Sequence, residues 1–153
     1  MAPRRRGPRP SMRLQDTVRL SADGIAKVLG DLEARLMRVV WDLGQPAPAR
    51  AIHEVVLEEH EVASLTVITV LNKLVSKGLL RRAKRDGLYH YHAVLPREEF
   101  MAQASRRVVE GIMALAPDAV AASFVDVLSE QDPEKLTELA RLIRRRLREQ
   151  EDR

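Results

Sequence analysis

The sequence contains no cysteine. This absence excludes a disulfide framework, a thiolate metal site and thiol redox chemistry. The sequence also lacks any apolar run that approaches the ~18 residues of a membrane-spanning helix, and no apolar segment follows its basic start as it would in a signal peptide. We therefore expect a cytoplasmic protein that does not insert into a membrane.

Sequence motifs of common enzyme classes are missing as well. There is no glycine-rich phosphate loop, no nucleophile elbow and no H-E-x-x-H pattern. Of the four histidines, only His90 and His92 are close in sequence. On one face of a strand they would supply two zinc ligands, which is half of a typical site. We predict no enzyme activity, no cofactor and no metal site, with metal sensing by this histidine pair as an alternative.

Composition and charge point to a helical protein with a polyanionic partner. Of the 153 residues, 45% are hydrophobic, 31% charged and only 3% aromatic, a balance typical of helix-rich domains with a packed core. The net charge of +4 is uneven, because residues 1–20 carry six Arg and one Asp, and residues 60–96 carry six Lys or Arg and two acidic residues. Localised positive charge suits nucleic acid, although two solvated charge clusters are the alternative.

The distribution of proline, glycine and charged residues divides the chain into three parts. Residues 1–23 are rich in Arg and Pro without periodicity, so we predict a disordered basic arm. Residues 24–96 form the next part. In its first helix, Glu33 stands three residues after Gly30, in the position of a capping-box acid. Pro48 is expected in the first turn of the second helix, and Ser64 is expected to be the N-cap of the third.

The stretch TVITVLNKLVSKGLL, residues 66–80, decides the type of fold. Five β-branched residues in a row favour a strand by propensity, yet its apolar residues have helical spacing and Gly78 stands where a helix would stop. Asp86-Gly87 then predicts a two-residue hairpin turn. Three short helices and a hairpin make a winged helix-turn-helix, so we predict a mostly α, α+β fold.

Residues 97–153 read as three amphipathic helices that form a dimerisation domain. Pro117 closes the first, and Asp132-Pro133 begins the last. Short helices of this kind have little core of their own, so burial against a second copy is the simplest solution. The expected homodimer interface consists of apolar residues on these helices: Leu115, Phe124, Val125, Leu128, Leu136, Leu139 and Ile143.

The second helix of a helix-turn-helix motif lies in the major groove of DNA. Thr69 offers a hydroxyl and a methyl group to base edges, Asn72 suits adenine, and Lys73 suits guanine or a phosphate. Tyr91 could donate to a phosphate or pack beneath the wing, and we leave both alternatives open. The predicted DNA-binding residues on the third helix and the wing are Ser64, Thr66, Ile68, Thr69, Asn72, Lys73, Lys77, Arg82, Lys84, Arg85 and Tyr91.

The ordered motifs resemble the penicillinase-repressor family of winged-helix regulators, the BlaI/MecI/CopY group. Its opening pattern is matched at Leu29, Asp31, Glu33, Leu36, Met37 and Trp41. Its recognition-helix pattern is matched at Thr66, Val67, Thr69, Leu71, Lys73, Leu74, Lys77 and Gly78, and the wing tyrosine at Tyr91. The resemblance implies a cytoplasmic repressor that binds palindromic operators as a homodimer, with release in many members through a membrane sensor metalloprotease that answers β-lactams.

Two departures from the family pattern limit what the resemblance implies. The copper-responsive branch uses clustered cysteines, which this chain lacks. The scissile Asn-Phe pair of the β-lactam branch is replaced by Arg107-Val108 in ASRRVVEG. The expected function is a sequence-specific transcriptional repressor, and the alternatives are a winged-helix protein-interaction module or a non-specific nucleoid-type DNA binder.

Overall fold

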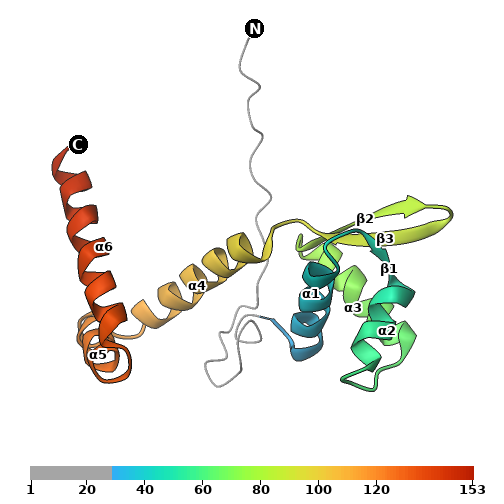
Figure 1. The fold of residues 1–153 in the computed structure, drawn as a ribbon, viewed down its shortest axis with the longest axis horizontal. Coiled ribbons are helices and arrows are strands. Elements are labelled where there is room, and N and C mark those ends of the chain that lie inside the picture. The colour runs from blue at the N-terminus through green and yellow to red at the C-terminus, as the bar shows by residue number, and fades with distance from the viewer. Residues whose placement is uncertain (1–28) are drawn as a thin grey trace, which may run out of the picture. The chain divides into compact units, whose positions relative to one another are not determined.

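The structure is a computed structural model that describes residues 29–153 (Figure 1). It confirms the predicted winged helix followed by further helices. The predicted arm at residues 1–23, and the first residues of the part predicted to bind DNA, lie outside the described residues. The elements in chain order are α1 (Asp31–Leu43), β1 (Ala47–Pro48), α2 (Ala49–Leu57), α3 (Ser64–Ser76), β2 (Leu80–Arg85), β3 (Leu88–Ala93), α4 (Arg97–Met113), α5 (Pro117–Gln131) and α6 (Pro133–Glu151).

The chain forms two compact units that divide between Val108 and Val109, within α4. The first unit has a core built from the apolar stripes of α1, α2 and α3, from which the β2–β3 hairpin projects (Figure 1). Burial of these stripes stabilises helices that propensity alone would leave marginal. The fully buried large side chains of this core include Leu29, Leu36, Met37, Ile52, Val67, Leu71, Leu74, Leu80 and Phe100.

The expected position of Glu33 at the start of α1 is confirmed, because Gly30 is the N-cap and Glu33 stands three residues after it. Its carboxylate is bonded to Lys73 and Lys77 of α3. Glu33 is buried, with 5% of the residue exposed. A buried carboxylate needs a charge partner more than an exposed one does, and the lysines of α3 are within its reach.

The sheet has a third strand that the sequence did not predict. Residues Ala47 and Pro48 form β1, which pairs antiparallel with β3 at Tyr91 and His90. The strand order is β1–β3–β2. Pro48 is therefore the N-cap of α2 and not a residue of its first turn. Its φ of −70° and ψ of 158° are extended, which proline permits at a sheet edge.

Helix α3 begins one residue earlier than the capping rule predicted. Ala63 is the N-cap, Ser64 is the first helical residue, and no side chain caps the amide groups. The predicted N-cap role of Ser64 is thus wrong. The predicted stop is confirmed, because Gly78 has a φ of +78° and the Leu79 amide donates to the Leu74 carbonyl oxygen at 3.0 Å. This is the 6→1 bond of a Schellman motif, which favours glycine.

The predicted hairpin turn is confirmed. Asp86 and Gly87 both have positive φ, 50° and 79°, as a type I′ turn requires. The register pairs Arg82 with Tyr91 and Lys84 with Tyr89. Because paired residues share a face of the sheet, these four side chains lie on one side of the wing.

Helix α4 begins as part of the first unit. Phe100 is 1% exposed, and its ring centroid lies 5.0 Å from that of Trp41 in α1. The Trp41 indole N–H also donates to the carbonyl oxygen of Leu95 at 3.0 Å. The predicted division after Pro96 lies at the start of this helix, whereas the two compact units divide further along it.

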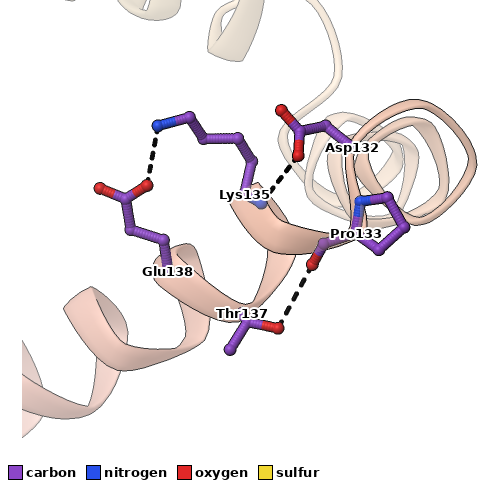
Figure 2. Close-up of polar contacts among 5 residues, drawn as sticks. All are labelled: Asp132, Pro133, Lys135, Thr137 and Glu138. Carbon is purple, nitrogen blue, oxygen red and sulfur yellow. Dashed lines mark hydrogen bonds and ion pairs between the residues drawn. The ribbon is translucent and has the colours of Figure 1, made fainter.

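The second unit contains α5 and α6, and no residue of either helix is buried. The predicted cap of α6 is confirmed: Asp132 Oδ1 accepts from the Lys135 backbone amide at 3.1 Å, and Pro133 begins the helix (Figure 2). One turn further on, the Lys135 ammonium donates to Glu138 at 2.8 Å and lowers the pKa of that carboxyl. Within residues 29–153, no helix is both long enough and apolar enough to cross a membrane.

Candidate nucleic-acid interface

The outer face of α3 combines small polar, aliphatic and basic side chains. Thr66, Ile68, Thr69 and Lys73 are exposed, whereas Val67, Leu71 and Leu74 on the opposite side are in the core. Leu65, at the start of the helix, is 73% exposed. Short hydroxyl and aliphatic side chains allow a helix to approach base edges closely, and their methyl groups suit the thymine methyl.

The Thr69 hydroxyl already uses its single proton in a hydrogen bond within the helix. It donates to the carbonyl oxygen of Leu65, four residues earlier, at 2.9 Å. A hydroxyl has one proton and two lone pairs. Toward a base, Thr69 would therefore act as an acceptor, for instance from the amino group of adenine or cytosine, while its methyl group offers apolar contact.

Two lysines of α3 share one buried carboxylate. Lys77 Nζ lies 2.7 Å from Glu33 Oε2, and Lys73 Nζ lies 3.3 Å from Glu33 Oε1. The two side chains differ in exposure: that of Lys77 is 19% exposed and that of Lys73 is 60% exposed. Lys77, predicted to bind DNA, is thus placed as the structural partner of Glu33, and Lys73 is the more accessible cation.

Asn72 lies where the helix meets the wing. Its Oδ1 accepts hydrogen bonds from Arg82 Nη1 at 2.8 Å and from the Tyr91 hydroxyl at 2.9 Å. Tyr91 is only 3% exposed, so its position is the packed alternative and not that of a free phosphate donor. Arg82 is the third of the six residues of β2, opposite Tyr91 on β3.

Basic side chains cover the exposed part of the wing. The Arg82 guanidinium lies 4.3 Å from the centroid of the Tyr89 ring, and Lys84 Nζ lies 5.3 Å from it. Arg81 and Arg85 alternate with these two along β2 and so belong to the opposite face of the strand. Cation–π contacts hold Arg82 and Lys84 near one ring, and the hydrogen bond from Arg82 to Asn72 joins this face of the wing to α3.

Sequence reasoning missed the contacts that organise this surface. Glu33 and Lys77 are 44 positions apart, and Asn72 and Tyr91 are 19 apart. No periodic pattern reports such pairs. The one sequence signal was the alternation of Tyr89 and Tyr91 with His90 and His92 along the return strand, which predicts that one pair faces the helices and the other faces outward.

The residues predicted at a dimer interface all lie in the second unit, on α5, on α6 and, for Leu115, in the turn after α4. Phe124, Val125 and Ile143 are each about half exposed, and Leu115 is 85% exposed. Leu128, Leu136 and Leu139 are less exposed. Helices α5 and α6 contact each other but leave a large apolar area uncovered.

Two further features concern metal-binding groups and hollows in the described part of the chain. Residues 29–153 contain no group of three His, Cys, Asp or Glu side chains that could hold a metal ion. A hollow of about 660 Å³ lies between the end of α1 and the start of α4. Three charged residues line it, and two of them, Arg97 and Asp42, are paired with each other at 2.6 Å, whereas Glu98 is the third.

Comparison with known proteins places these features in a family context. The family model for the penicillinase repressor matches residues 29–145. A transcriptional regulator named BlaI, from two strains of Mycobacterium tuberculosis, is 35% identical over 74 residues, which are 48% of this chain and 54% of that protein. This chain therefore spans about half the length of those relatives. An uncharacterized 16.5 kDa protein of Latilactobacillus sakei is 28% identical over 109 residues, 70% of this chain and 74% of that protein.

Proposed function

This chain belongs to the penicillinase repressor family, and from that premise we propose that it is a DNA-binding transcriptional repressor. Helix α3 would enter the major groove, and the β2–β3 wing would lie along the adjacent backbone. The observation that supports this proposal is the hydrogen bond from Arg82 to Asn72, which joins the exposed polar face of α3 to the cations of the wing.

The side chains divide into two groups by their chemistry. Thr66, Ile68 and Thr69 are accessible, short and close to the helix axis, so they are suited to read base edges. Lys73, Lys84 and Arg85 are exposed cations, suited to contact phosphates. Phosphate contacts supply affinity and register, whereas base contacts supply specificity.

A homodimer is the proposed assembly. The apolar side chains of α5 and α6 that remain exposed in one copy would be buried against the same surface of a second copy. A two-fold symmetric dimer presents two recognition helices, and a palindromic operator matches that symmetry. Two linked half-site contacts strengthen each other through their effective concentration.

Release through a membrane sensor metalloprotease is a further part of the proposal. The position that replaces the family's scissile pair, Arg107-Val108, lies in α4 where the two compact units divide. A cut there would separate the DNA-contacting unit from the dimerising helices. Immunoblots of cells treated with a β-lactam should then show a shorter fragment, and a chain that stays intact while its target genes are induced would contradict cleavage.

The central experiment is fluorescence anisotropy over a salt series. It compares a labelled duplex from upstream of the protein's own gene with a scrambled duplex. A repressor should prefer the native duplex and lose affinity steeply as salt rises. Equal binding to both duplexes would favour a nucleoid-type binder. An absence of binding at low salt would contradict the proposal and favour a protein-docking module.

A matched pair of lysine variants adds a test of the surface itself. Lys73→Ala removes an exposed ammonium on α3 and should weaken binding. Lys135→Ala removes one of similar exposure on α6, 62% against 60%, which also has a glutamate partner. Affinity lost equally in both variants would mean that only net charge matters, and that α3 has no special role.

A further inference from the structure

The oxygen atom of the Asn72 side chain is fully occupied in the free protein. It accepts from Arg82 Nη1 at 2.8 Å and from the Tyr91 hydroxyl at 2.9 Å. A guanidinium group can only donate, so the Asn72 atom that faces Arg82 must be the oxygen and not the nitrogen. An amide oxygen has two lone pairs, and these two donors use both.

This arrangement conflicts with a direct role of Asn72 in reading adenine. A bidentate contact requires the amide oxygen to accept from the adenine amino group while the amide nitrogen donates to N7. Both existing bonds to Oδ1 would have to break first. The Tyr91 hydroxyl would then lose its hydrogen-bond acceptor. Tyr91 is only 3% exposed, and an unpaired polar group at a buried site is unfavourable.

The same contacts hold Arg82 in a defined position. One nitrogen of its guanidinium is bonded to Asn72, and its central carbon Cζ lies 4.3 Å from the centroid of the Tyr89 ring. Tyr91 in turn fixes Asn72 from β3, on the strand that pairs with β2 at Arg82. A side chain that is already ordered loses less conformational entropy when it binds a ligand.

We propose that Asn72 and Tyr91 are positioning residues that hold Arg82 at the junction of α3 and the wing, where Arg82 contacts a backbone phosphate of the bound DNA. The inference rests on the proposed function and deepens it. Arg82 has five N–H donors, and one of them is bonded to Asn72. Its planar fork matches the geometry of a phosphate group, and its place beside the recognition helix suits the backbone that flanks the groove.

The test is a double-mutant cycle read by anisotropy over a salt series, on the native and the scrambled duplex. Arg82→Ala should weaken binding to both duplexes to a similar degree, roughly tenfold or more. It should also reduce the slope of log K against log salt concentration by about 1. Asn72→Ala should weaken binding to both duplexes by a smaller factor. In the double variant, Asn72→Ala should add little to the loss, because its effect passes through Arg82.

Two further variants separate positioning from a general effect on the fold. Lys84 also lies over Tyr89 but makes no hydrogen bond to Asn72, so Lys84→Ala and Asn72→Ala should be additive. Tyr91→Phe keeps the buried ring and removes only the hydroxyl. It should reproduce part of the Asn72→Ala loss, and that loss should disappear when Arg82 is already alanine.

The possible results are distinguishable. Asn72→Ala could weaken binding to the native duplex alone, with the loss traced to one A·T pair. Asn72 would then read a base, and the inference would be overturned. An unchanged salt slope in Arg82→Ala, with steep salt dependence in the unmodified protein, would overturn the phosphate contact alone. Failure of the unmodified protein to bind either duplex would instead overturn the proposed function.

Discussion

Glu33 Oε2 lies 2.7 Å from Lys77 Nζ, across the contact between α1 and α3. The two side chains are 7% and 19% exposed, and Lys73 approaches the other carboxylate oxygen at 3.3 Å. The buried carboxylate is therefore neutralised by two cations one helical turn apart. This cluster ties the helix proposed to enter the major groove to the core of its own unit.

Lys77→Met should lower the free energy of unfolding by about 1–3 kcal/mol, since it leaves a buried carboxylate with only its longer ion pair. The apolar stem of the side chain is retained, so little packing is lost. Urea denaturation followed by circular dichroism measures the change.

Lys135→Met is the control for that variant. Its ion pair with Glu138 joins two side chains that are 62% and 53% exposed, and pairs of this kind contribute little. A loss as large as that of Lys77→Met would show that burial of Glu33 does not set the cost.

Thr69→Ala should reduce discrimination between the native duplex and one altered in a single base pair by about 1–3 kcal/mol. The variant removes both the acceptor and the methyl group offered to the groove. Ser76→Ala is the matched control, because that hydroxyl also donates to a carbonyl oxygen four residues earlier, at 3.1 Å. Anisotropy measures both variants, and equal losses on specific and random DNA would contradict base reading by Thr69.

Phe100→Ala should destabilise the first unit by about 3–5 kcal/mol, because it removes a fully buried ring and leaves a cavity beside Trp41. The neighbouring variant Met101→Ala removes a side chain that is 39% exposed, and the change should stay near 0.5 kcal/mol. Thermal unfolding followed by Trp41 fluorescence compares them. Similar melting temperatures would mean that the start of α4 is not part of this core.

Ile143→Asp should convert the proposed dimer to monomers in sedimentation velocity. The residue is 51% exposed in one copy, so the fold of the unit should tolerate the change, whereas a buried, unpaired carboxylate at an interface would not be tolerated. Leu57→Asp, at a 45% exposed position of α2, should leave the sedimentation coefficient unchanged. A dimer that persists in Ile143→Asp would place the interface elsewhere.

Local sequence signals were enough for most of the fold. Helical spacing outweighed the β propensity of residues 66–70, because burial of Val67 and Leu71 stabilises α3 more than propensity opposes it. Asp86-Gly87 correctly predicted the turn, since few residues accept positive φ. Strand β1 was missed because two residues carry no period, and it exists only through its pairing with β3.

The candidate interface was less accessible to sequence reasoning. Which side chains are exposed on α3 follows from periodicity, but which of them are already bonded does not. The position of Glu33 at the start of α1 follows from its neighbours in sequence, whereas its charge partners are on another helix. Lys77 and Tyr91 likewise matched a recognition pattern, and only the tertiary structure gives their partners within the protein.

The bond between Asn72 and Arg82 also bears on how this surface can evolve. A change at position 72 that removes the acceptor would release the arginine, and a change at position 82 would leave the amide oxygen with one donor fewer. Substitutions at the two positions are thus expected to co-vary among relatives. Differences in overall DNA affinity between such proteins should be assigned to the pair as a unit, and a swap of one residue without the other should transfer that affinity incompletely.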